Sequence, residues 1–224
     1  MLRYIASVLL VIGGLGLTAQ NKFIPSSLRV GTELVLVGVS TFNSDRTAYE
    51  LTADIDFHKY FLSFDYGYGD RIRNEEKYIY QSTGNYFRIG PDINFLYYDK
   101  RSSVLFLGMR YAKSNYDDQV TFIREDPNYG SVPIERENKD LEASWLELLL
   151  GIKVRIWKEL YMGYNLRFKF SRSFEADNLF PFDIPGYGSA EDRSRFDLNY
   201  YIYYKIKWKE KPLLPKPREK RRQG

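Results

Sequence analysis

The sequence contains no cysteine and a single histidine among its 224 residues. The absence of cysteine excludes a disulfide framework, a thiolate metal site and a thiol nucleophile. Histidine is the commonest general base and a frequent metal ligand, so one copy gives little support for either chemistry. That residue, His58, lies between two predicted strands, where an exposed turn residue is the simpler interpretation. We therefore expect no catalytic residue, no metal site and no cofactor.

Long apolar runs are also missing, apart from one near the N-terminus. Residues 5–17 are apolar or small, follow Arg3 and precede small residues that end at Ala19. This order is typical of a secretory signal peptide, and the run is shorter than the roughly 20 residues that a spanning helix needs. The sequence thus predicts a signal peptide over 1–19 and no transmembrane helix after it.

An excess of positive charge is missing from the central part of the chain, although the whole sequence carries +4. The segment 209–224, "KEKPLLPKPREKRRQG", carries seven Lys or Arg and two Glu. Subtracting this +5 and the +1 of Arg3 leaves residues 20–208 at −2. A nucleic-acid-binding domain needs a basic patch on a folded face, so we expect no nucleic-acid partner. We expect the segment 209–224 to form an extended, basic and Pro-rich periplasmic tail, which is either solvated or in contact with anionic lipid head groups or another protein.

What the chain does contain is alternation of apolar and polar residues. In "FDLNYYIYYKIKWK" (196–209) every second residue is apolar or aromatic, and the residues between include Asp197, Asn199 and Lys205. Such period-two patterns are typical of β-strands with one apolar face. The sequence predicts eight of these strands, over 28–39, 47–57, 60–69, 84–96, 104–112, 141–156, 160–174 and 196–209.

The predicted connections alternate between short and long. The short ones are 58–59, 97–103 and 157–159, and the long ones are 40–46, 70–83, 113–140 and 175–195. Short turns at one end, long loops at the other and an even number of strands are typical of outer-membrane barrels. We therefore predict an all-β fold for residues 20–208, an eight-stranded antiparallel up-and-down transmembrane β-barrel in the outer membrane.

The direction of the two faces separates this fold from a soluble lipocalin-like barrel, which holds its apolar face inside. The polar face carries many glycines, and an eight-stranded barrel is so narrow that small residues must sit between large ones inside it. It also carries charges of both signs, and aromatic residues gather at the ends of the apolar face, as they do at membrane boundaries. We therefore predict an outward apolar face and a lumen plugged by an interior charge network, made of Glu50, Asp54, Asp56, Asp65, Arg88, Asp92, Arg110, Glu147, Lys153, Arg155, Arg167 and Lys169.

Several stretches resemble the small outer-membrane β-barrel proteins of Bacteroidota. They are the "LTAQ" region, the aromatic-rich strands "YELTADIDF", "YFLSFDYGYG" and "YMGYNLRFKF", and the closing "YYIYYKIKW". The resemblance covers about residues 1–208 and implies an outer-membrane location and a barrel fold. It also suggests an accessory role. The chain departs from the usual pattern at its end, because sixteen residues follow Trp208 where such barrels commonly finish on an aromatic residue.

The predicted loop 175–195 contains the apolar stretch "FPFDIPGYGS". We interpret it either as an exposed surface for a partner or as a loop that folds over the barrel mouth and packs on itself. Under the first interpretation, the candidate partner residues are Phe180, Phe182, Ile184 and Tyr187.

These features favour a non-enzymatic outer-membrane protein, an accessory or adhesion-type component that acts through its long loops and tail. Its expected partners are outer-membrane lipid and other envelope proteins, contacted through 113–140, 175–195 or 209–224. Three alternatives stay open at this point: a small transport pore, a lipid-modifying outer-membrane enzyme and a soluble periplasmic binder of apolar ligands.

Overall fold

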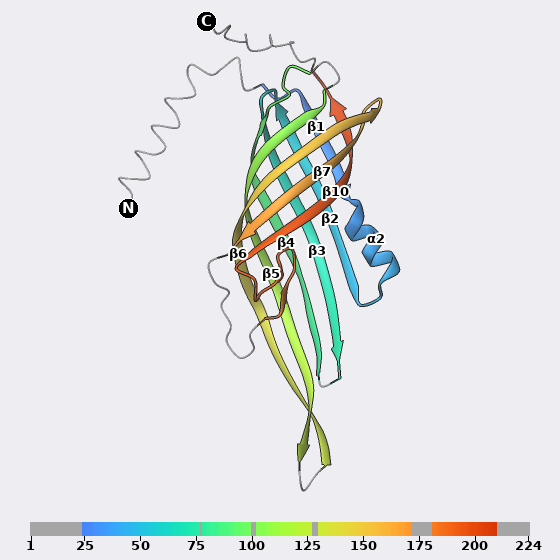
Figure 1. The fold of residues 1–224 in the computed structure, drawn as a ribbon, viewed down its shortest axis with the longest axis vertical. Coiled ribbons are helices and arrows are strands. Elements are labelled where there is room, and N and C mark those ends of the chain that lie inside the picture. The colour runs from blue at the N-terminus through green and yellow to red at the C-terminus, as the bar shows by residue number, and fades with distance from the viewer. Residues whose placement is uncertain (1–23, 77, 100–101, 127–129, 172–180, 210–224) are drawn as a thin grey trace, which may run out of the picture.

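The computed structural model describes residues 24–76, 78–99, 102–126, 130–171 and 181–209. Eight strands form one closed barrel (Figure 1): β1 (Ser27–Glu33), β2 (Arg46–Phe57), β3 (Tyr60–Glu75), β4 (Tyr78–Asn94), β5 (Val104–Asp126), β6 (Gly130–Trp157), β7 (Leu160–Phe170) and β10 (Ser194–Lys207). A helix, α2 (Leu34–Phe42), and a small ladder of β8 (Asp183–Ile184) and β9 (Gly188–Ser189) complete the described elements.

Each barrel strand pairs with its neighbours in sequence, and β1 closes the ring by pairing with both β2 and β10. All eight pairings are antiparallel, so the predicted eight-stranded up-and-down barrel is confirmed. The predicted signal peptide lies outside the described residues, as does the predicted tail beyond Lys209. Among the described residues, no helix is both long and apolar enough to span a membrane.

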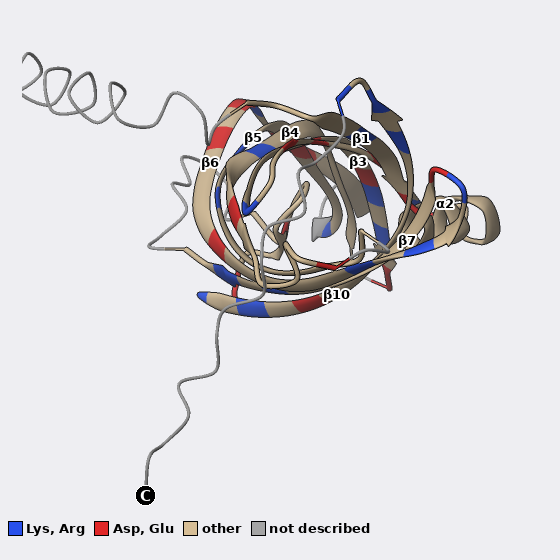
Figure 2. Cartoon of the chain, turned by 90° about the horizontal axis from the view of Figure 1, so that it is seen from above, with Lys and Arg blue, Asp and Glu red and all other residues tan. Residues whose placement is uncertain are grey.

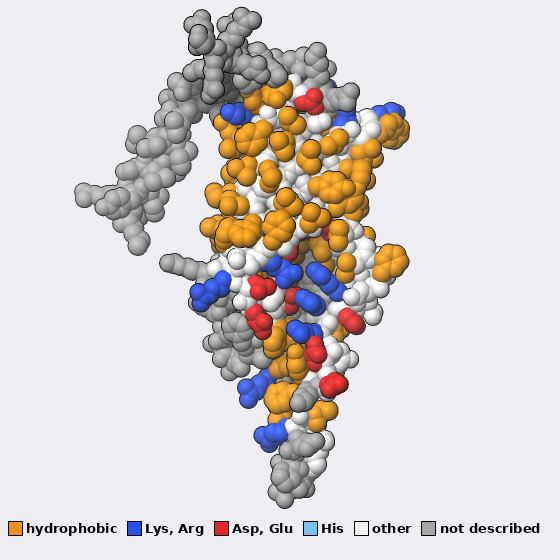
Figure 3. Space-filling view, viewed as in Figure 1, with side chains coloured by type: hydrophobic (Ala, Val, Ile, Leu, Met, Phe, Trp, Pro, Cys, Tyr) orange, Lys and Arg blue, Asp and Glu red, His pale blue; other side chains and the backbone are white. Residues whose placement is uncertain are grey.

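The two faces of the strands point as the alternation predicts, with apolar side chains outward. On β2, Leu51 is 61 % exposed, whereas its neighbour Glu50 is 1 % exposed. The same contrast recurs around the ring, and the outward side chains form an apolar belt that covers the barrel (Figure 3). A lipocalin-like barrel has the reverse arrangement, because it encloses its apolar face.

Small residues make room for large ones inside the barrel. Gly67 on β3 faces the ring of Tyr86, and Gly151 on β6 faces the ring of Phe106. A Cβ at either glycine would overlap the facing ring. Eight strands leave an interior just wide enough for side chains, so each bulky ring needs such a gap beside it.

The short connections lie at the end of the barrel where the described chain begins and ends, here called the turn end (Figure 1). The other end, here called the mouth, carries α2, the β3–β4 and β5–β6 hairpins, and the segment 181–190. Figure 2 looks along the barrel and shows α2 outside the ring of strands.

The first strand is shorter than predicted, because it ends at Glu33 and α2 occupies residues that were expected to stay extended to Val39. The stretch "LVLVGV" is apolar at nearly every position, so it lacks the alternation of a strand with one polar face. Glu33 caps the helix with its carboxylate, which accepts a hydrogen bond from the backbone N–H of Leu36.

Strands β3 to β6 are longer than predicted. The expected loop 113–140 is a β-hairpin for most of its length, in which β5 and β6 pair out to Asp126 and Gly130. One register shift, at Asp117, interrupts that ladder. Polar residues stand on both faces of the hairpin, so the sequence there shows no apolar alternation that would mark a strand.

Candidate functional site

The interior of the barrel holds eleven of the twelve residues predicted for the charge network, all with buried side chains. The exception is Arg155, which is exposed and therefore lies outside the network. It pairs with the buried Tyr161 but stands two residues before β6 ends at Trp157, at the turn end, where its side chain is exposed. Arg29, Tyr86 and Tyr201 also belong to the buried interior, although the predicted network omits them.

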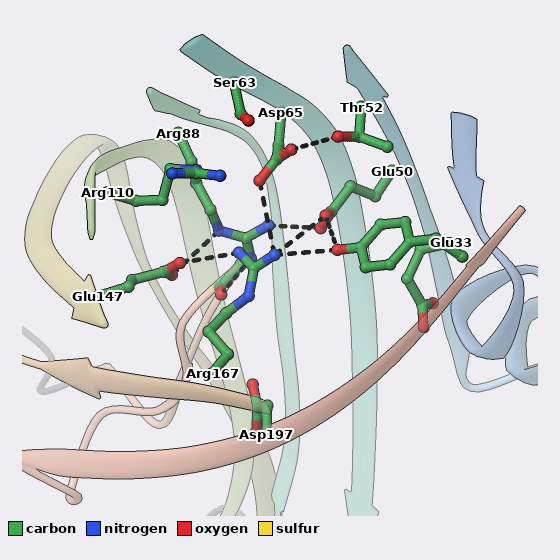
Figure 4. A network of polar contacts seen from close by, with 12 residues as sticks. Glu33, Glu50, Thr52, Ser63, Asp65, Arg88, Arg110, Glu147, Arg167 and Asp197 are labelled. Carbon is green, nitrogen blue, oxygen red and sulfur yellow. Dashed lines mark hydrogen bonds and ion pairs between the residues drawn. The ribbon is translucent and has the colours of Figure 1, made fainter. Parts of the chain in front are cut away.

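The centre of the network joins four strands through two arginines and two glutamates (Figure 4). Arg88 Nη1 lies 2.5 Å from Glu50 Oε2, and Arg88 Nε lies 3.1 Å from Glu147 Oε1. Arg167 Nη1 lies 2.8 Å from Glu147 Oε2. Because β2, β4, β6 and β7 supply these four residues, the cluster bridges opposite parts of the barrel wall.

Neutral donors complete the shell of this central cluster. The hydroxyl groups of Tyr86 and Tyr201 donate to Glu50 at 2.7 and 2.6 Å, and the indole N–H of Trp145 donates to Glu147 at 2.6 Å. Buried charges are tolerated only when partners of this kind offset their loss of water. The interior is therefore a connected polar network.

Two further ion clusters lie closer to the turn end. Asp54 forms ion pairs with both Arg29 Nε, at 2.8 Å, and Lys153 Nζ, at 2.6 Å. Arg110 holds Asp92 through two nitrogen atoms, at 2.6 and 2.9 Å. Aromatic rings cover the cations, with the Arg29 guanidinium 4.5 Å from the Phe61 ring centroid.

The segment 181–190 folds into the mouth, which corrects its assignment as an exposed partner surface. Ile184 and Tyr187 are fully buried and belong to an apolar cluster that includes Tyr86 and Trp145. The rings of Tyr187 and Trp145 meet edge to face, with centroids 5.4 Å apart. The alternative interpretation, a loop that packs over the mouth, describes this segment better.

The remaining two residues of the predicted partner loop differ in position. Phe182 is half-buried, and its ring contacts Tyr80 with centroids 5.2 Å apart. Phe180 lies outside the described residues. The sequence could not show whether this loop is exposed or buried, because an apolar loop rich in Pro and Gly has the same composition in both cases.

Cations of the barrel wall hold the segment 181–190 in place. Arg88 Nη2 donates to the carbonyl of Gly186 at 2.9 Å, and Lys169 Nζ donates to the same carbonyl at 2.7 Å. Nearer the rim, Arg71 pairs with Asp183 at 2.7 Å. Gly186 has φ +82°, a backbone conformation that residues other than glycine rarely adopt, and a Cβ at this position would overlap the Tyr86 ring.

A cavity of about 280 Å³ lies beside this segment, under the mouth. It is bounded by α2, the ends of β2 and β3 nearest the mouth, the segment 183–188 and the first residues of β10. Its charged lining includes Arg46, Arg71, Lys169 and Arg195. This cavity is the candidate binding site of the described chain.

Two other kinds of site find no support in the described residues. No group of three or more metal-ligating side chains gathers there. His58 sits in the β2–β3 turn with φ +72°, at the opposite end of the barrel from the cavity.

Comparison with known sequences assigns the family. The sequence model of DUF6048, described as a domain of unknown function, matches residues 1–211. The chain belongs to the DUF6048 family. A search of curated proteins found no match. Among solved structures, the chain is similar to CarO of Acinetobacter baumannii, with 14 % identity over 84 % of this chain and 100 % of the CarO chain, and a TM-score of 0.41.

Proposed function

We propose that this DUF6048 protein is a non-enzymatic β-barrel of the outer membrane, closed by its interior network and by the segment 181–190, that serves as an accessory or adhesion-type component. The observation that carries the proposal is the apolar belt around a charged, ion-paired interior (Figure 3). An outward apolar face suits lipid, and the ring of eight paired strands closes toward the turn end, where β1 pairs with both β2 and β10.

The closed lumen favours this role over a transport pore. Glu50, Arg88, Glu147 and Arg167 meet across the barrel, and the segment 181–190 contacts them through the Gly186 carbonyl, which accepts from Arg88. Eight strands leave an interior that side chains can fill, so we expect no steady conductance in planar bilayers. Stable channel openings of the purified protein would replace the proposal by the pore alternative.

The outward face of β3, β4 and β5 near the mouth replaces the segment 181–190 as the best candidate surface for a protein partner. Beyond the apolar belt, Ile72, Ile79 and Ile123 share the outward face of the sheet formed by β3, β4 and β5. Their side chains are between 37 % and 65 % exposed. A cluster of exposed isoleucines among polar residues is a typical contact surface.

Heat modification and cross-linking test the proposal in sequence. We expect the protein in the outer-membrane fraction, with different mobility in unboiled and boiled samples on a denaturing gel. Because the chain lacks cysteine, an Ile123→Cys variant carries a single site for a cross-linker. Arg124→Cys is its matched control, because it is the adjacent residue on the opposite face of the same strand.

Each step has an outcome that contradicts the proposal. A soluble periplasmic protein without heat modification would reject the membrane location. Equal cross-linking from Ile123→Cys and Arg124→Cys, or none from either, would reject the isoleucine face as a partner surface. Altered lipid A in cells that lack the protein, analysed by mass spectrometry, would favour the enzyme alternative instead.

A further inference from the structure

The barrel wall is not built of eight strands over its whole height. β1 pairs with β10 only from Tyr201 to Lys207, and with β2 only from Leu51 to Asp56. Toward the mouth, the start of β10 (194–200) and the start of β2 (46–50) therefore have no strand between them. Helix α2 stands in that place, at the edge of the ring (Figures 1 and 2).

The helix is bonded to one side of this gap. Ser40 Oγ donates to the carbonyl of Ala48 at 2.8 Å and accepts from the N–H of Ala48 at 2.6 Å, so it replaces a strand neighbour for β2. On the other side, Glu33 accepts from the N–H of Tyr200 at 3.1 Å. Within the described residues, no hydrogen bond joins α2 itself to β10.

The cavity lies along this unbonded boundary between α2 and β10, which we call the seam. Its lining includes Asp197 and Asn199, which face the lumen, and also Phe196 and Leu198, which face outward. Because successive residues of a strand point to opposite faces, a cavity that contacts both sets extends past the strand edge. The seam thus connects the cavity with the outside of the barrel wall.

The two ends of the cavity differ in chemistry. Between α2 and β10, the lining includes Val35, Leu36 and Val39 on the helix and Phe196 and Leu198 on the strand. These apolar side chains suit an acyl chain, and the space that they line is called the acyl channel here. Toward the lumen and rim, the lining carries the cations Arg46, Arg71, Lys169 and Arg195.

Most charges of the lining already have partners. Asp183 pairs with Arg71, and Asp197 pairs with Lys169 at 2.5 Å and with Arg195 at 3.0 Å. The other carboxylates are bonded as well: Glu33 by two backbone N–H groups, Glu50 by Arg88, and Asp70 by Gln81 and Thr83.

Arg46 is the exception, since no carboxylate of the described chain pairs with it. It stands directly opposite Arg71 in the β2–β3 register, so both side chains lie on the same face. Like charges at directly opposed positions destabilise a sheet. Asp183 pairs with Arg71, so the cation of this opposed pair without a carboxylate partner in the described chain is Arg46, and a further anion beside the two guanidinium groups would neutralise it.

We propose that the seam is a lateral binding site for an anionic lipid, with its acidic head group at Arg46 and Arg71 and its acyl chain between α2 and β10. The lipid enters sideways from the membrane, because the seam opens through the wall at the border of the apolar belt. The inference rests on the membrane insertion proposed above.

Photolabelling in nanodiscs tests the site. The probes are diazirine-bearing phosphatidylglycerol, which is anionic, and diazirine-bearing phosphatidylcholine, which has no net charge. We expect the anionic probe to label 34–42 and 194–199 preferentially, as mapped by mass spectrometry of the digested protein. We expect the neutral probe to label the belt evenly.

Two substitutions with matched controls separate the head-group site from the acyl channel. Arg46→Ala should reduce seam labelling by about tenfold, the effect of removing one charge-assisted contact. Lys113→Ala, which removes a partly exposed cation outside the cavity, should leave the seam labelling unchanged. Leu198→Trp fills the acyl channel and should abolish the labelling, whereas Leu148→Trp, on the belt at β6, should not.

Two outcomes would overturn the inference. They are equal labelling by the two lipids and labelling spread evenly along the belt. Heat modification of every variant checks that it has folded. A wild-type protein that fails to insert refutes the proposed function, whereas one that inserts but shows no preferential labelling refutes the lipid site alone.

Discussion

Replacing Arg167 by methionine is the sharpest test of the interior network. Its guanidinium contacts Glu147 at 2.8 Å, Asp65 at 3.5 Å and Glu50 at 3.7 Å, and it is 1 % exposed. Methionine fills a similar volume but carries no charge. Glu147 would keep only Arg88 as a cation, and Asp65 would keep only the hydroxyl of Thr52.

The expected cost follows from leaving buried carboxylates without their cation. Removing one partner of a buried ion pair destabilises proteins by about 3–5 kcal/mol. We therefore expect Arg167→Met to lower the free energy of unfolding by about 3–5 kcal/mol. Adding Glu147→Gln to this variant should recover part of the loss, because the orphaned charge is then removed as well.

Urea unfolding in detergent micelles, followed by tryptophan fluorescence, measures this effect. Trp145 donates its indole N–H to Glu147, so its emission reports on the cluster itself. Arg155→Met is the matched control, since the same side chain is exposed there and its loss should change stability by less than about 0.5 kcal/mol. A similar cost for both substitutions, or a cost below about 1 kcal/mol for Arg167→Met, would refute the reasoning.

Three further predictions concern packing, capping and pH. Gly67→Val should destabilise the barrel by about 1–3 kcal/mol in urea unfolding, because its side chain would collide with Tyr86, and an unchanged midpoint would contradict the tight interior. Glu33→Ala should lower the free energy of unfolding by about 1 kcal/mol, because the helix loses its cap at the N–H of Leu36. Hydrogen exchange should become faster in α2 and change little in β7. Burial raises the pKa of Asp118, which lies beyond the apolar belt. The fold therefore favours the protonated, neutral carboxyl group of Asp118, and the β5–β6 hairpin should become better protected against amide hydrogen exchange as the pH falls through that pKa. Asp118→Asn should remove this pH dependence.

The alternation of side chains was sufficient to predict the barrel. A period of two with one apolar face defines each strand, and the short connections between strands require antiparallel neighbours. The inward glycines and the mixed charges indicated which face turns inward. Eleven of the twelve network residues could be named for the same reason, since facing the lumen depends only on position along a strand.

Three features depended on contacts between distant residues. Arg155 follows the alternation and pairs with the buried Tyr161, but its side chain is exposed because β6 ends two residues later at the turn end of the barrel. Ile184 and Tyr187 are buried because the lumen offers them Tyr86 and Trp145, which are far away in sequence. The β5–β6 hairpin has polar residues on both faces, so pairing between its strands, and no apolar pattern, holds it extended.

Local periodicity along the chain is therefore enough to predict the antiparallel strands, the outward apolar face and the charged interior. The pairing of the charges, the loop that fills the mouth and the opening in the wall depend on tertiary contacts. The seam illustrates the difference: "LVLVGV" is apolar in any context, but it becomes one side of a cavity only because β1 stops at Glu33 and β10 continues beside it to Ser194. Such arrangements arise from the meeting of segments that local sequence does not connect.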